Sequence, residues 1–395
     1  MKKPSYHRRL GAEEIGLWKN KTPLLTYLDL ELTERCNNDC IHCYINLPAH
    51  DREAKAKELS TDEIKAILEE AASLGCLGVR FTGGEPLLRE DFEELYVFAR
   101  KLGLKVTIFT NAALISPRLA EIFVRMPPLD KIEVTLYGMK KRSYEKITRV
   151  PGSFKAAWRG IELLQENKVP FVVKGAYLPF NKDEIQEFES WASGIPWMDH
   201  SPPYSQSFNF RCRRDSDEKN RLIKGLRLPP EEGLKILIRN EAEFIKEMKL
   251  FCSKFVAAKG GKLFSCGAGN GRGCVDAYGY FSPCLLLKNP ATNYDINKGS
   301  LKDALTVFFP KVRSMRAKNP DYLARCARCF LRGLCNQCPA RSWMESGELD
   351  APVEYLCQIA HAKARYLNLL KADEKAWEVT EWKERLHNFV SADQP

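Results

Sequence analysis

Apolar and polar residues alternate at two different periods through the first half of the chain. In TYLDLEL (26–32), leucines at 28, 30 and 32 share one face and acidic residues lie between them, which is the period of a β-strand. Four further strand-like runs occupy residues 78–81, 105–109, 131–136 and 171–178. Helical spacing of apolar residues predicts helices at 61–75, 91–102, 117–125 and 153–167. Alternating β and α units of this length imply a parallel sheet or a barrel.

The rhythm stops near residue 196. A loop-like stretch and a charged helical stretch (229–258) follow, and Gly and Cys dominate from residue 259. A last helical segment is expected at 352–371. The pattern predicts an N-terminal extension, an α/β domain, a bridging segment with a loop and a helix, a cysteine-rich domain and a C-terminal tail, at residues 1–23, 24–195, 196–258, 259–371 and 372–395.

The composition of the 395 residues is that of an ordinary globular protein, with 44% hydrophobic and 28% charged residues. The net charge is +10, yet Lys and Arg are spread along the chain without a nucleic-acid motif, so we expect no nucleic-acid partner. No apolar run is long enough to span a membrane, and the basic N-terminus lacks the apolar core of a signal peptide. A cytoplasmic, reducing location is therefore expected, where clustered cysteines bind metal more often than they form disulfides.

Eleven of the fourteen cysteines, three plus four plus four, fall into groups with spacings that suit iron–sulfur clusters. The first group is Cys36-x3-Cys40-x2-Cys43, directly after the first predicted strand. The other eight are interleaved in the C-terminal half, at Cys266, Cys274, Cys284, Cys326, Cys329, Cys335, Cys338 and Cys357. Three spare cysteines without partners at ligand spacing are expected to be buried thiols, namely Cys76, Cys212 and Cys252.

The first group lies at the end of a strand, where parallel α/β folds place their active sites. Three thiolates hold three irons of a 4Fe–4S cube, so the fourth iron stays open to a small chelating molecule. A zinc site is the alternative, but such a site normally requires a fourth Cys or His ligand. His42 lies between two of the cysteines and is poorly placed to close such a site.

A second motif, FTGGEP (81–86), follows the next predicted strand. Gly83 and Gly84 allow backbone freedom and the close approach of a ligand. Glu85 offers a carboxylate suited to an ammonium group, and Pro86 stiffens the exit. Alone this motif is weak, but combined with the three-cysteine loop one strand earlier it is specific.

Together, CNNDCIHC and TGGEP resemble the radical S-adenosylmethionine (SAM) superfamily over about residues 24–195. The resemblance implies a partial (β/α)6 TIM-like barrel in which Cys36, Cys40 and Cys43 bind a 4Fe–4S cluster whose open iron is chelated by SAM. Gly83, Gly84, Glu85 and Pro86 match the segment that binds the methionyl amino group.

Other SAM contacts are implied by the same resemblance. Thr110 and Asn111 match a strand-end TNG motif in which Ala112 replaces the glycine. Thr135 in VTLYG stands where a serine often contacts SAM, and Tyr137 there replaces the usual Asp. The remaining implied contacts are made by the side chain of Arg149 to the SAM carboxylate and by the backbone at Tyr44 to adenine.

The C-terminal half resembles the SPASM extension of that superfamily, which implies two auxiliary 4Fe–4S clusters and three in all. By this resemblance one cluster takes Cys266, Cys274, Cys284 and Cys338, with Cys274 the variable ligand. Without Cys274 that cluster would keep an open iron for substrate. The other cluster takes Cys326, Cys329, Cys335 and Cys357. The final pair, Cys335 and Cys338, is one residue closer than is usual.

The resemblance implies an oxidoreductase-type enzyme that cleaves SAM reductively and removes hydrogen from a peptide or protein, in the manner of maturases of ribosomally made precursors. Implied partners are a precursor peptide and a low-potential electron donor such as ferredoxin or flavodoxin. About 25 residues precede the first strand, so leader recognition would need a separate protein or the barrel surface. Leu285 stands where sulfatase-maturing relatives have an aspartate, which argues against that subgroup. The alternatives are a small-molecule or tetrapyrrole enzyme, such as a side-chain decarboxylase, and a non-catalytic zinc scaffold.

Overall fold

The structure, a computed structural model, describes residues 23–198, 208–212, 216–255, 258 and 260–391. The predicted N-terminal extension (1–23) therefore lies outside the described residues except for Pro23. The described residues form two compact units. The first comprises the described part of 1–205 together with Gly267–Pro310, and the second comprises the described parts of 206–266 and 311–395.

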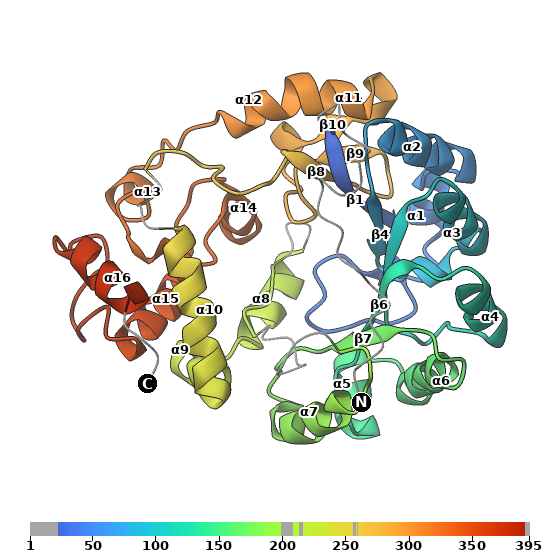
Figure 1. Ribbon diagram of the computed structural model, residues 1–395, viewed down its shortest axis with the longest axis horizontal. Helices are drawn as coiled ribbons and strands as arrows, with labels where there is room; N and C mark the ends of the chain where they lie inside the picture. The colour runs from blue at the N-terminus through green and yellow to red at the C-terminus, as the bar shows by residue number, and fades with distance from the viewer. Residues whose placement is uncertain (1–22, 199–207, 213–215, 256–257, 259, 392–395) are drawn as a thin grey trace. The chain divides into compact units, whose positions relative to one another are not determined.

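The first unit is built on one eight-stranded sheet, in the order β10-β9-β8-β1-β4-β5-β6-β7 (Figure 1). Its five strands from the N-terminal half run parallel, at β1 Leu25–Thr33, β4 Gly78–Gly83, β5 Lys105–Thr110, β6 Leu129–Thr135 and β7 Phe171–Lys174. On the other side of β1 lie β8 Gly271–Val275, β9 Tyr280–Ser282 and β10 Tyr294–Asp295. Since β8 is parallel to β1, six consecutive strands share one direction. The predicted parallel α/β architecture is confirmed.

Helices cover the outer side of this sheet (Figure 1). They are α2 Thr61–Ser73, α3 Phe92–Lys101, α4 Pro117–Arg125, α6 Ser153–Glu166 and α7 Ile185–Ser193. Shorter elements of this unit are β2 Arg35–Cys36, β3 Leu47–Pro48, α1 Arg52–Lys57, α5 Lys141–Thr148 and α11 Leu301–Asp303. The start of α2 is fixed by a capping box, in which Ser60 accepts from the Glu63 N–H and Glu63 accepts from the Ser60 N–H.

Alternation along the strands separates an apolar face from a polar one. Leu28 and Leu30 of β1 and Phe81 of β4 are fully buried. The residues between them carry charge, and Asp29 of β1 accepts a hydrogen bond from Arg80 of β4 at 2.8 Å. The face with alternating charges is thus the one that the outer helices do not cover.

The second unit is mostly helical. Its helices are α8 Asp217–Gly225, α9 Pro230–Leu237, α10 Glu241–Lys254, α13 Pro320–Ala324, α14 Pro339–Ser346, α15 Glu354–Tyr366 and α16 Trp382–Ser391, and α12 Phe309–Arg313 spans the boundary between the units. The stretch predicted as helical at 229–258 comprises the helices α9 and α10, which a 3-10 turn at Ile238–Asn240 separates. The segment predicted as a tail contains α16, whose Leu386 is buried.

The strand β8 was not predicted, because its GRGCV sequence lies in a Gly-rich and Cys-rich stretch that we interpreted as cluster-binding loop. Tertiary pairing overrides the weak strand propensity of glycine here. Gly273 is required for packing as well, since a Cβ at this position would lie 2.3 Å from the Phe281 ring. The sixth parallel strand therefore comes from the cysteine-rich region rather than from residues 24–195.

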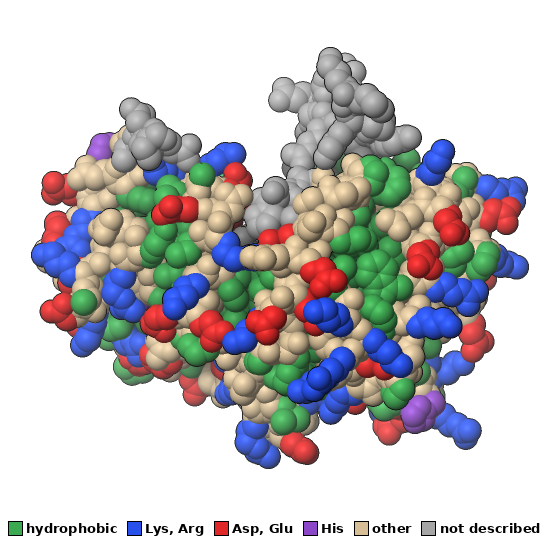
Figure 2. Space-filling view, turned by 90° about the horizontal axis from the view of Figure 1, so that it is seen from below, with side chains coloured by type: hydrophobic (Ala, Val, Ile, Leu, Met, Phe, Trp, Pro, Cys, Tyr) green, Lys and Arg blue, Asp and Glu red, His purple; other side chains and the backbone are tan. Residues whose placement is uncertain are grey.

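No helix in the described residues is long and apolar enough to cross a membrane. On the face in view in Figure 2, Lys and Arg side chains are interspersed with Asp and Glu. The basic net charge is therefore not gathered into a one-sign patch on this face.

Candidate functional site

The first cysteine group lies in the loop that follows β1. The loop is attached to the end of α5, because the Asp39 N–H donates to Thr148 O at 2.9 Å and the Ile41 N–H to Ile147 O at 3.0 Å. Within the loop, the Cys43 N–H donates to Cys40 O at 3.0 Å. Backbone hydrogen bonds thus set the course of the three-cysteine segment.

The structure brings the three thiols together. Burial raises the pKa of Cys36 to about 12, and the negative charges of Glu85 and Cys43 add to the shift. The pKa of Cys40 is raised for the same reasons, by burial first and then by Cys43 and Cys36. Mutually repelling thiolates in a buried site are stabilised when each bonds to a metal, so this donor set fits a cluster.

Among the described residues, no three Cys, His, Asp or Glu side chains converge tightly enough to hold one metal ion. A cube of four irons takes one thiolate on each iron, so its ligands need not meet at a point.

The two glycines of GGEP are explained by contact with the chain itself. A Cβ on Gly83, whose φ is +127°, would lie 2.1 Å from Thr33 O, and one on Gly84 would lie 2.2 Å from Arg35 O. The Gly84 N–H donates to Thr33 O at 2.7 Å and the Glu85 N–H to Arg35 O at 2.9 Å. The glycines therefore bring this segment against the residues just before Cys36.

The Glu85 carboxylate is buried and well connected. Its oxygens accept from the Thr110 hydroxyl at 2.8 Å, the Asn111 N–H at 2.8 Å and the Leu87 N–H at 3.2 Å. Burial nevertheless raises the pKa of Glu85 to about 7, because these bonds only partly offset the loss of water. A buried carboxylate of this kind favours a cationic partner such as an ammonium group. Pro86 begins the 3-10 turn Pro86–Leu88 that follows.

Asn111 links the carboxylate to the cysteine loop. Its backbone binds Glu85, its side-chain Nδ2 donates to Asn37 Oδ1 at 2.8 Å, and the same atom lies 3.9 Å from Cys36 Sγ. Ala112, which replaces the family glycine, has a left-handed φ of +62°. The TN pair thus connects the two motifs that the sequence singled out.

The remaining predicted SAM contacts are more dispersed. Arg149, at the C-terminal end of α5, forms an ion pair with Asp39 at 2.5 Å and donates from Nε to Asp39 O at 2.8 Å. Thr135 ends β6 and is partly buried, as is Tyr44 beyond Cys43. The structure places Arg149 on the cysteine loop itself.

His42 packs against Tyr137, the residue that replaces the family aspartate. Their ring centroids are 4.7 Å apart in an edge-to-face arrangement. Burial lowers the pKa of His42 to about 4, so the imidazole is neutral. We interpret this pair as a packing contact that holds the cysteine loop against the residues that follow β6.

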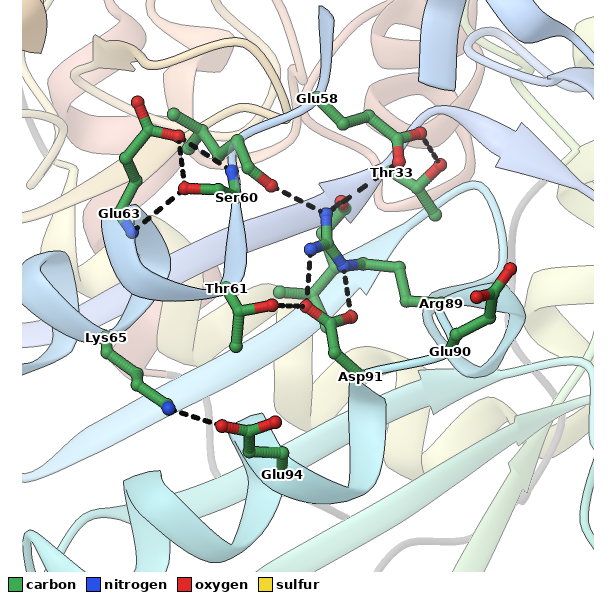
Figure 3. Close-up of polar contacts among 12 residues, drawn as sticks. Thr33, Glu58, Ser60, Thr61, Glu63, Lys65, Arg89, Glu90, Asp91 and Glu94 are labelled. Carbon is green, nitrogen blue, oxygen red and sulfur yellow. Dashed lines mark hydrogen bonds and ion pairs between the residues drawn. The ribbon is translucent and has the colours of Figure 1, made fainter. Parts of the chain in front are cut away.

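A buried ionic network, which the sequence did not reveal, holds the chain directly before the cysteine loop. Arg35 donates from Nε to Glu58 at 2.8 Å and from Nη1 to Ala49 O at 3.0 Å. Figure 3 shows its neighbour Arg89, which binds Asp91 through Nε at 2.8 Å and Nη2 at 2.6 Å. Arg89 also donates to Leu32 O at 3.2 Å. No spacing rule marks the Arg35–Glu58 pair, since its members are 23 positions apart in the sequence.

The second unit contains a small pocket of about 50 Å³ that is lined by four cysteines. They are Cys326, Cys329, Cys335 and Cys357, the set predicted for one auxiliary cluster. Burial, followed by the charge of Cys335, raises the pKa of Cys329. A donor set of four thiols around one pocket fits a closed cluster.

The other predicted auxiliary set is divided between the units. Cys274 and Cys284 belong to the first unit, whereas Cys266 and Cys338 belong to the second. Cys274 lies fully buried on β8, in register with Asp29 of β1. The assignment of this set stays a prediction. The three spare cysteines are buried, as expected.

The first unit is a parallel α/β fold in which three thiols lie near a buried carboxylate, and this combination defines a class of cluster-binding protein. Comparison with known proteins identifies the family of this unit. Residues 30–192 match the radical SAM superfamily. This stretch of the chain is a domain of that enzyme superfamily, and the domain implies a 4Fe–4S cluster and SAM.

Among curated relatives, the chain is 33% identical over 180 residues to the Fe-coproporphyrin III synthase of Methanosarcina barkeri. That alignment covers 46% of this chain and 42% of the relative, so the chain spans less than half the relative's length.

Two solved structures have a similar fold over most of this chain. Streptococcus suis SuiB bound to precursor peptide SuiA is 18% identical with a TM-score of 0.61, covering 83% of this chain and 74% of that one. Native anSMEcpe with bound AdoMet and Cp18Cys peptide is 15% identical with a TM-score of 0.57, covering 92% and 98%. At these identities the likeness concerns the fold.

Proposed function

We propose that this protein uses SAM radical chemistry to modify a peptide or protein, with one SAM-binding cluster and two auxiliary clusters. The observation that carries the proposal is the pocket of four cysteines in the second unit, found together with the three-cysteine site beside Glu85 in the first. A site for radical generation alone has no need of a second closed thiol set.

At the first site, Cys36, Cys40 and Cys43 hold the cluster, and Glu85 binds the methionyl ammonium of SAM. When bound, the cluster and SAM together supply a 5′-deoxyadenosyl radical that removes hydrogen from the substrate. Thr110 and the Asn111 N–H hold Glu85 in place. Asn111 donates toward Cys36, and the Cys40 side chain is buried in the loop. Gly83, Gly84, Pro86, Thr135, Tyr44 and Arg149 complete the SAM site in this proposal.

The auxiliary clusters take Cys266, Cys274, Cys284 and Cys338, and Cys326, Cys329, Cys335 and Cys357. In this proposal they accept the electron left on the product radical or ligate substrate. Residues 259–371 then form a SPASM domain whose first strand, β8, completes the sheet of the α/β unit.

The peptide substrate is supported by the two structural neighbours, whose structures contain a precursor peptide and the Cp18Cys peptide. A cytoplasmic location, a low-potential donor such as ferredoxin or flavodoxin, and a separate leader-binding protein complete the proposal.

The test is anaerobic purification with iron analysis and a SAM cleavage assay. We expect about twelve irons per chain, four for each cluster, with 5′-deoxyadenosine formed on reduction. Replacing Cys36, Cys40 and Cys43 with Ala should abolish 5′-deoxyadenosine, whereas Cys326→Ala should remove about four irons. Zinc in place of iron, or 5′-deoxyadenosine from the triple variant, would refute the assignment. Mass spectrometry of candidate precursors co-expressed with the protein then tests the substrate.

A tetrapyrrole substrate is the second candidate, favoured by the 33% identity over 180 residues to Fe-coproporphyrin III synthase. Consumption of a porphyrin with propionate side chains, with no mass change on any co-expressed peptide, would favour it over the peptide.

A further inference from the structure

The four-cysteine pocket of the second unit has a cationic wall. Besides the cysteines, Arg325, Arg332, His361 and Trp377 line it. The inference below rests on the proposed function, because it concerns the cluster that these cysteines would hold.

Arg325 lies directly on one of the four thiols. Its Nη2 atom is 3.8 Å from Cys357 Sγ, within reach of a charge-assisted N–H···S hydrogen bond. Its Nη1 atom binds Glu354 at 2.5 Å and Asp321 at 3.2 Å. The guanidinium carbon lies 4.8 Å over the Trp377 ring. Two carboxylates and an indole therefore fix this cation beside Cys357.

One N–H of the same side chain lacks an acceptor. Arg325 Nε is buried, and none of the described residues accepts its hydrogen bond. An unsatisfied buried donor costs about 1–3 kcal/mol. A sulfur atom of a bound cluster would be a suitable acceptor, so the orphaned N–H fits an occupied pocket.

The segment predicted as a C-terminal tail helps to hold this wall. The Ala376 N–H donates to His361 Nε2 at 3.2 Å, so Nε2 carries no hydrogen. The hydrogen of the neutral ring is then on Nδ1, which lies 2.9 Å from Cys357 O. Through this imidazole the tail is tied to Cys357, and Trp377, next to Ala376, packs edge-to-face on the ring at 5.5 Å. The ring of Trp377 is thereby kept beneath Arg325.

We infer that Arg325 is a positioning residue that raises the reduction potential of the cluster held by Cys326, Cys329, Cys335 and Cys357. One-electron reduction adds a negative charge to a cluster that is already anionic with four thiolates. A fixed cation and its N–H groups at Cys357 stabilise that added charge, and the indole limits screening by water. Glu354 acts in the opposite sense, since it partly neutralises Arg325.

The test is a redox titration of the reconstituted full-length protein, followed by electron paramagnetic resonance. The Cys326→Ala variant identifies the signal of this cluster by its loss. Dithionite supplies the electron. Arg325→Gln should lower the midpoint potential, on the order of tenfold in the reduction equilibrium or about 59 mV for one electron. Glu354→Gln should raise the potential, and Arg325→Lys should retain most of the wild-type value.

Arg328→Gln is the matched control, since it removes an exposed arginine three positions away. It should shift the potential far less than Arg325→Gln. Equal shifts at both positions, or shifts of the same sign in Arg325→Gln and Glu354→Gln, would overturn the inference. Should Arg325→Gln fail to fold, the rise expected in Glu354→Gln decides alone. Full iron and an unchanged signal in Cys326→Ala would instead refute the cluster itself.

Discussion

At the residue scale, the first site combines groups that are costly to bury. Glu85 and the thiols of Cys36 and Cys40 all have pKa values raised by burial. Each of them prefers to be neutral in the empty site and charged beside a ligand. The residues required for binding are therefore a source of instability until cluster and SAM are bound.

Glu85→Gln makes this cost measurable in protein free of cluster and SAM. The folded pKa of Glu85, about 7, exceeds the ordinary 4.5, so the folded state holds a proton that the unfolded state has lost between these values. Glu85 should thus lower wild-type stability as pH rises from 4.5 through 7, by roughly 3 kcal/mol at most. The variant should lack the part of the fall that Glu85 contributes and keep the part that Glu31, also raised to a pKa of about 7 by burial, contributes. Urea unfolding of wild type and variant at pH 5 and pH 8 measures their free energies of unfolding. If the two proteins differ in free energy of unfolding by the same amount at both pH values, the prediction is wrong.

At the element scale, the α1–α2 segment is anchored to the end of β1 by buried charge. Arg35 and Glu58 expose only 7% and 5% of their side chains, so their pair is shielded from water and salt. Glu58 also accepts a hydrogen bond from Thr33 on β1. The anchor lies immediately before Cys36, so it positions the first ligand.

Glu58→Gln should therefore destabilise the protein by about 3–5 kcal/mol, because it leaves Arg35 buried without its counter-charge. The control is Glu90→Gln, which removes the exposed partner of Lys55 and should cost less than about 1 kcal/mol. Chemical denaturation of both variants measures the difference. Similar losses at the two positions would show that burial of the Arg35–Glu58 pair is not the cause.

Elements with regular periodicity were predictable from the sequence, whereas pairing at long range was not. The leucines of β1 and the capping box of Ser60 and Glu63 gave correct positions for β1 and α2. The strand β8 was hidden because its glycines and Cys274 carry no alternation, and it exists only by pairing with β1. The site motifs could be recognised in the sequence. The contacts of Gly84 with Arg35 and of Arg325 with Cys357, however, depend on tertiary structure.

At the scale of the whole molecule, the chain enters each compact unit twice. It leaves the first unit for residues 206–266, returns for Gly267–Pro310 and leaves again. The returning segment supplies β8, which shields one edge of β1. The α/β unit is thus incomplete without residues that follow the first 205.

A fragment ending at residue 205 should consequently aggregate. Without β8, the backbone N–H and C=O groups along one edge of β1 are unpaired, and this strand carries the fully buried Leu28 and Leu30. Size-exclusion chromatography of the fragment beside the full chain measures the outcome. A monomeric fragment with the circular dichroism of a folded α/β protein would contradict the expectation.

The pairing of β1 with β8 also has a consequence during synthesis. Thr26 and Gly271, which share a hydrogen bond, are 245 positions apart. At ribosomal speeds of 5–20 residues per second, β1 waits roughly 12–50 s for its second neighbour to emerge. Over that interval the nascent chain presents a leucine-rich strand with an open edge, which is a target for chaperones. Slow or stalled translation before residue 275 would lengthen the exposure, so expression yield should depend on codon choice in that stretch.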